Sequence, residues 1–175
     1  MKLTLTQAPA SNETDLSTIK PVYGSDKAAC FDLKADLKGR LIQYKNTTPS
    51  SWSANGTDGE ILLCDNPHQS FRLEKGERAL VPTGFIFGIP DGFRMNIVSR
   101  SGLSWNSGII VLNAPGVIDE DYVDETFVVV HNTSSEPFII EHGDRIAQAE
   151  INPVYRVELD SLGERESGFG SSGLK

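Results

Sequence analysis

The sequence is poor in cysteine and has no long apolar run. Its 175 residues include only two cysteines, Cys30 and Cys64, which is too few for a disulfide framework or a zinc site. One disulfide between them is the alternative to two thiols, and thiols are expected in a reducing compartment. No apolar stretch reaches the length of a membrane span, and residues 1–6 lack the long apolar core of a signal peptide. We therefore expect a cytoplasmic protein that does not enter a membrane.

Basic residues are also scarce. The chain has 16 Lys and Arg against 24 Asp and Glu, a formal net charge of -8. Nucleic-acid binding requires a basic footprint that the sequence does not suggest, so we expect no nucleic-acid partner. An anionic nucleotide would need locally concentrated cations and a metal ion. Arg100, Arg145 and Arg165 are candidates for this role, with ordinary surface arginines as the alternative.

Short β-branched and aromatic runs, separated by turn-forming residues, make up much of the chain. This pattern is typical of an all-β barrel or jelly roll. The length suits one domain, which we place at residues 1–163, with residues 164–175 as a flexible C-terminal flap. One short helix is expected at residues 101–106. The expected strands cover residues 79–89 (with a central turn), 95–98, 109–112, 127–131, 138–140 and 146–151.

Residues 40–70 are unusual because a polar, turn-rich stretch is followed by the apolar run at 61–64. A loop of this length without its own structure is uncommon in a compact domain. We therefore predict an inserted hairpin whose arms are residues 41–44 and 60–64. We expect it to decorate the surface, and a partner-binding role is the alternative.

The C-terminal residues 168–173 place Phe169 among glycines and serines. A segment with one large apolar side chain cannot fold alone. Glycine lets the backbone approach an anion, Ser171 and Ser172 add hydroxyl donors, and the Phe169 ring offers a flat apolar face. The pattern predicts a flap that orders over a phosphorylated, ring-bearing ligand, and a frayed terminus or linker is the alternative.

Residues 116–122 combine two acids with a tyrosine near a turn. In an extended chain Asp119 and Asp121 share one face, until the turn breaks the alternation. An aspartate beside Tyr122 can give one pocket both a base and a ring wall. An ordinary acidic hairpin with a packed tyrosine is the alternative.

Taken together, these segments resemble the homotrimeric dUTP diphosphatases, or dUTPases. The resemblance implies a jelly-roll-like distorted β-barrel that hydrolyses dUTP to dUMP and pyrophosphate, limiting uracil in DNA and supplying dUMP for dTMP synthesis. Five segments resemble the family motifs in the family's order, which makes the resemblance specific where any one motif would be weak. They are residues 29–35, 99–103, 113–122, 143–148 and 168–173.

The resemblance assigns the chemistry to residues 113–122. It implies that Asp119 is the general base that activates water for attack on the α-phosphorus. Tyr122 is implied to exclude a ribose 2′-hydroxyl by packing flat against deoxyribose. Uracil contacts are implied for the amide of Asn113 and the backbone of Val117 and Ile118. Phe127 is implied to line the same pocket, and a plain strand-core role for its side chain is equally open.

Phosphate binding is implied for two other segments. Arg100, Ser101 and Gly102 would offer a guanidinium group, a hydroxyl and an open N–H to phosphate oxygens. Gln148 is implied to reach the phosphates or the attacking water. Asp32 is implied to hold Mg²⁺ indirectly, through water, while the triphosphate itself is the main ligand of the ion.

The flap completes the implied site. Phe169 would stack on uracil, Gly170 belongs to the same substrate-binding set, and Arg165, Ser171 and Ser172 would close on the γ-phosphate. The resemblance further implies a homotrimer in which each active site takes segments from different subunits. Four features depart from the family pattern: Cys30 and Asp124 replace glycines, Ser99 replaces a proline, and Arg165 lies one residue closer to Phe169 than usual.

Two alternatives to a dUTP diphosphatase stay open. One is a dCTP deaminase, or a bifunctional deaminase–dUTPase, of the same fold. The other is a dUTPase-like regulatory protein that binds a partner through residues 40–70. Tyr122 and the tail that carries Phe169 favour the diphosphatase over the deaminase. The architecture suits a bacterium or a phage.

Overall fold

The computed structural model describes residues 2–11, 14–45, 60–64, 66 and 68–159. Within these ranges the chain forms fourteen strands, two α-helices and a 3₁₀-helix at Pro9–Ser11. No helix found there is long and apolar enough to cross a membrane. The helices are α1 (Leu16–Ile19) and α2 (Ser101–Ser107). The strands are β1 (Thr4–Gln7), β2 (Val22–Tyr23), β3 (Phe31–Lys34), β4 (Leu41–Lys45), β5 (Glu60–Leu63), β6 (Ser70–Leu73), β7 (Arg78–Pro82), β8 (Phe85–Gly88), β9 (Phe93–Val98), β10 (Ile109–Val111), β11 (Gly116–Ile118), β12 (Phe127–Asn132), β13 (Phe138–Glu141) and β14 (Arg145–Pro153).

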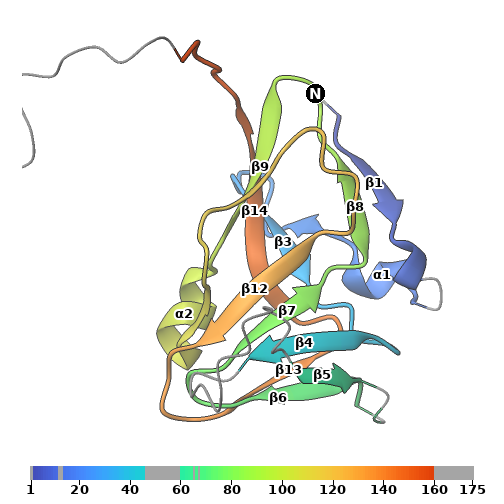
Figure 1. Ribbon diagram of the computed structural model, residues 1–175, viewed down its shortest axis with the longest axis vertical. Helices are drawn as coiled ribbons and strands as arrows, with labels where there is room; N and C mark the ends of the chain where they lie inside the picture. The colour runs from blue at the N-terminus through green and yellow to red at the C-terminus, as the bar shows by residue number, and fades with distance from the viewer. Residues whose placement is uncertain (1, 12–13, 46–59, 65, 67, 160–175) are drawn as a thin grey trace, which may run out of the picture.

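Two five-stranded sheets form the body of the fold (Figure 1). One has the strand order β10–β12–β7–β4–β5, and the other has the order β11–β9–β14–β3–β2. The pairs β1–β8 and β13–β6 form two small additional sheets. In Figure 1 the first sheet lies in front of β9, β14 and β3, so the two large sheets form two layers. This arrangement agrees with the predicted all-β, jelly-roll-like fold.

Alternating residues of the strands fill the core between the layers. Val128 and Val130 of β12 are buried, as are Met95 and Ile97 of β9. Successive side chains of a strand point to opposite faces, and each buried aliphatic side chain contributes about 1.5–3 kcal/mol. A shift of one residue would move the whole buried set to the other face, so this pattern fixes the strand register that positions the site.

The predicted elements agree with the observed ones to within two residues. The segment at residues 79–89 divides into β7 and β8 at Gly84, which has a φ of 79°, and the expected helix is α2. The sequence did not reveal α1, β1, β2, β3, β6 or β11. Each of these elements has four residues or fewer, so a period of side chains is hard to detect in it. Length alone does not explain the difference, because the equally short β5, β8, β10 and β13 were predicted from their apolar runs.

The two predicted arms of the segment at residues 40–70 do pair. Leu41 lies opposite Leu63 in the β4–β5 ladder. The expectation of surface decoration was wrong for β4, because this strand also pairs with β7 and buries Ile42 in the core. The first arm is therefore an interior strand of a large sheet. No disulfide joins Cys30 to Cys64.

Candidate active site

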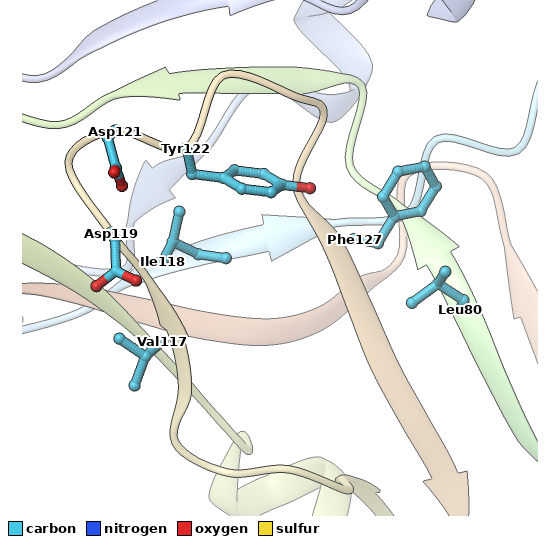
Figure 2. Close-up of a pocket in the computed structure, with 7 residues that line it drawn as sticks. All are labelled: Leu80, Val117, Ile118, Asp119, Asp121, Tyr122 and Phe127. Carbon is cyan, nitrogen blue, oxygen red and sulfur yellow. The ribbon is translucent and has the colours of Figure 1, made fainter.

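The first group of predicted site residues lies around the loop that follows β11. This strand is at the edge of its sheet, where Ile118 lies opposite Met95 of β9. Beyond it the chain turns, and the Tyr122 N–H donates to the Asp119 carbonyl over 3.2 Å. The turn ends the alternation of the strand, so Asp119, Asp121 and Tyr122 line the same pocket (Figure 2).

The pocket combines apolar walls with two carboxylates. Its volume is about 410 Å³, which suits a small ring-bearing ligand. Figure 2 shows the Tyr122 ring above Ile118, with Asp119 and Asp121 to one side and Phe127 and Leu80 to the other. The lining residues are Leu80, Val117, Ile118, Asp119, Asp121, Tyr122 and Phe127.

Tyr122 is fixed at its backbone and at its hydroxyl. The hydroxyl donates to the Glu125 carbonyl over 3.0 Å, while 39% of the residue stays exposed. Burial raises the pKa of the Tyr122 phenol, and the charges of Asp124 and Glu125 raise it further. The side chain is therefore an uncharged ring wall at neutral pH.

Glu120 makes contacts with two other segments of the chain. Its carboxylate accepts a hydrogen bond from the Gly92 N–H, and Arg156 Nη2 lies 2.8 Å from its Oε1. The hydrogen bond from Arg156, followed by that from Gly92, lowers the pKa of Glu120. Glu120 thus ties the loop to the β8–β9 turn and to the segment after β14, whereas its neighbours Asp119 and Asp121 line the pocket.

The loop after β11 lies beside the start of β9, since Ile118 is opposite Met95. The second group of predicted site residues lies at the other end of β9, beyond Val98. Gln148 of β14 lies opposite Asp32 of β3 on one side and Val98 of β9 on the other. Arg100 Nε donates to Asp32 Oδ1 over 2.9 Å, and Arg145 Nη1 donates to Asp32 Oδ2 over 3.2 Å. Arg100 Nη1 also donates to the Arg145 carbonyl over 2.9 Å. The mostly buried Asp32 carboxylate therefore holds two guanidinium groups in place.

The start of α2 extends this cationic region. Arg100 precedes the helix, and Ser101 and Gly102 form its exposed first residues. A Cβ built at Gly102 would meet no atom within 4 Å. Gln148 Nε2 donates to the Ser99 carbonyl over 3.3 Å, which brings β14 to the same place. The predicted residues Arg100, Ser101, Gly102 and Gln148 thus lie around one open surface that suits an anion.

Asn113 lies against the beginning of β11. A Cβ built at Gly116 would be 3.3 Å from Asn113 Nδ2 and 3.6 Å from Ile97 Cβ. Glycine at this position therefore permits the close approach of the amide. Asn113 is exposed and does not line the pocket around Asp119 and Tyr122.

The predicted metal site can be tested against its donor groups. In the described ranges, no group of three or more His, Cys, Asp or Glu side chains could hold a metal ion. Both oxygens of Asp32 accept hydrogen bonds from arginines. These residues fit an ion whose main ligands come from phosphate oxygens and water, which is the coordination that Mg²⁺ favours.

The two groups are far apart within one chain. Asp119 follows Ile118, which lies opposite Met95, whereas Arg100 lies just beyond the other end of β9. An extended chain rises about 3.3 Å per residue, so the two groups are separated by roughly 20 Å. In Figure 1, β9 extends from the upper part of the molecule toward α2, which begins directly after Arg100.

The sequence analysis did not predict one pocket residue, Leu80, and one contact, that of Arg145 with Asp32. Leu80 lines the pocket only because β7 pairs with β12, and no local signal shows that pairing. Arg145 was noted as a cation, but its bond to Asp32 was not expected. The predicted residues Arg165, Phe169, Gly170, Ser171 and Ser172 lie outside the described part of the chain, so their roles stay predictions.

Comparison with protein families gives a clear match. Residues 67–173 match the family model described as dUTPase. A protein named deoxyuridine 5'-triphosphate nucleotidohydrolase from Anaplasma marginale is 49% identical over 159 residues, which cover 87% of this chain and 88% of that one. A protein of the same name from Rhizobium etli is 45% identical over 160 residues, which cover 88% and 85% of the two chains.

Solved structures share the fold at lower identity. The dUTPase from Streptococcus mutans has a TM-score of 0.63 and 20% identity, covering 90% of this chain and 99% of that one. A mutant dUTPase from phage phi11 of S. aureus, described with a coordinated structural Mg(II) ion, has a TM-score of 0.65 and 18% identity, covering 95% and 100%. At these identities the similarity concerns the fold alone.

Proposed function

This chain belongs to the dUTPase family, and on that basis we propose that it hydrolyses dUTP to dUMP and pyrophosphate in the cytoplasm. One observation carries the proposal: the pocket in which Asp119 and the Tyr122 ring lie on one short loop. The reaction needs a positioned base, a wall for the nucleoside and cations for the phosphates. The two groups of residues at the ends of β9 have these properties.

Asp119 is the proposed general base. Its carboxylate accepts a proton from a water molecule as the water oxygen bonds to the α-phosphorus. The bond from the α-phosphorus to the bridging oxygen breaks, and pyrophosphate leaves with that oxygen. The turn that joins Tyr122 to Asp119 supports this role, because it places the carboxylate beside the proposed nucleoside wall.

The uncharged Tyr122 ring is the proposed wall for deoxyribose. A ring packed against C2′ leaves no room for a 2′-hydroxyl, so ribonucleotides are excluded by shape. The backbone of Val117 and Ile118 and the amide of Asn113 would bind uracil, which offers both donors and acceptors. Phe127 would complete the apolar side of the pocket.

The second group is the proposed phosphate site. The guanidinium group of Arg100, the hydroxyl of Ser101, the open N–H of Gly102 and the amide of Gln148 would contact phosphate oxygens. Asp32 would orient Arg100 and, through water, contact the hydration shell of Mg²⁺ on the triphosphate. The ion would supply neutralisation of phosphate charge.

We also propose that the active site is shared between subunits of a homotrimer. One triphosphate must contact both the base and the phosphate-binding groups, but these lie roughly 20 Å apart along β9 in one chain. The loop of one subunit would therefore face the Arg100 group of another. The flap at residues 164–175 would close the site, with Phe169 on uracil and with Arg165, Gly170, Ser171 and Ser172 at the phosphates.

Pyrophosphate release measured with each dNTP, and with UTP as the ribonucleotide control, tests the activity directly. We expect rapid release from dUTP and little from the other nucleotides. Incubation with dCTP and an assay for ammonia separates a deaminase from a diphosphatase. Ammonia without pyrophosphate, or no turnover of dUTP, would overturn the proposal.

A further inference from the structure

A buried charged network lies behind the loop that carries the pocket. The Arg40 side chain is 6% exposed and the Asp36 side chain is fully buried. Arg40 Nη1 donates to Asp36 Oδ2 over 2.6 Å and to Ser11 Oγ over 2.6 Å, and Thr14 Oγ1 donates to Asp36 Oδ1 over 2.8 Å. One side of the guanidinium group is thus fixed by the N-terminal part of the chain.

The other side of Arg40 reaches the loop. Arg40 Nη2 donates to Glu125 Oε2 over 2.5 Å, and the Glu125 side chain is only 9% exposed. The second carboxylate oxygen, Glu125 Oε1, accepts the Gly84 N–H over 2.8 Å. Burial alone lowers the pKa of Arg40, but hydrogen bonding and charge from Glu125 and Asp36 raise it overall. The pair is therefore a charged, nearly dry contact between residues 85 positions apart.

The absence of a side chain at Gly84 permits the hydrogen bond from its N–H to Glu125. It has a φ of 79°, and a Cβ built there would be 3.1 Å from Asp36 Oδ2 and 3.1 Å from Ser11 Oγ. A side chain at this position would be strained and would push into the network. The glycine thus lets the backbone N–H approach Glu125 beside the buried charges.

Glu125 connects the network to the pocket. Its backbone carbonyl is the acceptor of the Tyr122 hydroxyl at 3.0 Å. Because Arg40 and the Gly84 N–H hold the Glu125 side chain, the backbone carbonyl of the same residue is also held in place. Without these two contacts, the carbonyl would move with the loop. At its other end, the Arg40 carbonyl accepts the Cys64 N–H over 2.9 Å, which joins the network to the base of the β4–β5 hairpin.

We propose that Arg40 and Glu125 are positioning residues, which act through the Tyr122 hydroxyl to hold its ring where it discriminates deoxyribose from ribose. This inference rests on the proposed function, in which the Tyr122 ring meets the sugar. Neither residue touches substrate. In this inference the geometry of the buried pair fixes one orientation of the loop, although a buried ion pair contributes little net stability against apolar replacements.

The most direct test is Glu125→Gln. The glutamine oxygen can still accept the Gly84 N–H, but the amide nitrogen would then face Arg40 Nη2, so that two donors meet. We expect the ratio of kcat/KM for dUTP over UTP to fall about five- to tenfold, a change typical of coupled neighbours. Arg40→Lys keeps the positive charge but loses the two-pronged guanidinium group that bonds Asp36 and Glu125 together. It should lower the same ratio by a smaller factor.

Tyr122→Phe tests the same connection without altering the buried pair. It removes only an exposed hydroxyl, so the variant folds even if Glu125→Gln does not. We expect it to lower the dUTP-to-UTP ratio by a similar factor. The double variant should lose no more selectivity than either single variant, because both changes release the same ring. Glu74→Gln is the matched control, since Glu74 pairs with Arg72 on an exposed surface, and it should leave the ratio unchanged.

The outcomes separate positioning from general stability. A lower Tm with kcat reduced equally for dUTP and UTP would overturn the inference, because a merely structural role would not alter selectivity. Additive losses in the double variant, or an unchanged ratio in Tyr122→Phe, would overturn it too. If the unaltered chain does not hydrolyse dUTP, the proposed function itself fails. If Tyr122→Ala leaves the ratio unchanged, Tyr122 does not discriminate the sugar, and the inference that rests on this role fails while the proposed hydrolysis stands.

Discussion

The two ends of β9 carry opposite kinds of chemistry. At one end, the Asp119 and Asp121 carboxylates stand in an apolar pocket beside the neutral Tyr122 ring. At the other end, Arg100 and Arg145 share the Asp32 carboxylate. In the proposed function, the first region binds the nucleoside and supplies the base, and the second binds the phosphates, so neither region suffices alone.

This contrast explains how an acidic chain can act on an anionic substrate. With a net charge of -8, the acidic pocket alone would repel a triphosphate. Arg100 and Arg145 lie away from Asp119 and Asp121 within one chain, because they pair with Asp32 at the other end of β9. Assembly of several chains would then bring the loop of one chain to the cationic surface of another.

The largest effect is expected from Asp119→Asn. The amide keeps the shape of the side chain but cannot accept the proton of the attacking water, so turnover should fall about 10³-fold. Binding of dUTP should stay close to that of the unaltered chain, because this residue acts on the water. Pyrophosphate release and calorimetric dUTP binding are the two measurements. Turnover within a few-fold of the unaltered chain would exclude Asp119 as the base.

Arg100→Gln should lower kcat/KM about 10²-fold, because it removes one of the preorganised charges at the phosphates. Arg145 still pairs with Asp32 in this variant, so the buried carboxylate keeps a partner. Steady-state kinetics with dUTP gives the measurement. Arg72→Gln, which removes an arginine from an exposed ion pair, is the matched control and should retain activity.

Mixed assemblies of these two variants test whether the site is shared. If Asp119 and Arg100 serve one site from different subunits, random mixing should restore about one quarter of the original sites. If they serve a site within one chain, every site in the mixture carries a lesion. Differently tagged chains would prove that mixed trimers form. No recovery in proven mixed trimers would contradict the shared site.

The sequence predicted local strands and turns more reliably than it predicted which groups meet. Runs such as residues 127–131 and 146–151 carry their own period, so β12 and β14 were found. The turn at Asp119 was expected from local residue types. By contrast, the contact between Arg40 and Glu125 and the position of Leu80 in the pocket depend on strand pairing across the chain. Periodicity and motif spacing contain no information about such partners.

A smaller effect is expected from Tyr122→Ala. Loss of the ring opens space at C2′, so the ratio of kcat/KM for dUTP over UTP should fall about 30-fold, within the range for shape-based exclusion. Tyr155→Ala removes a tyrosine that is exposed in the chain and is the control. An unchanged ratio in Tyr122→Ala would place sugar discrimination elsewhere.

The smallest effect concerns stability and pH at His142, which lies outside both regions. Its Nδ1 accepts the Leu37 N–H over 3.1 Å, and Nε2 lies 2.9 Å from Thr18 Oγ1. Burial lowers the pKa of His142, the Asp36 carboxylate opposes this by raising it, and Lys38 adds to the lowering. The neutral ring suits these contacts, because a protonated Nδ1 could not accept the Leu37 N–H.

The sign of the pH dependence follows from this lowered pKa. Between the lowered pKa and the value of about 6.5 expected in the unfolded chain, the unfolded state binds more protons, so stability rises with pH. The contribution of His142 is complete above about pH 6.5 and is lost as the pH falls toward the folded pKa. We expect His142→Asn, whose amide oxygen can still accept the Leu37 N–H, to reduce the fall in Tm between pH 7 and pH 5 by about 2 °C. His68→Asn, which alters an exposed histidine, should leave that fall unchanged, and identical Tm profiles for both variants would contradict the assignment.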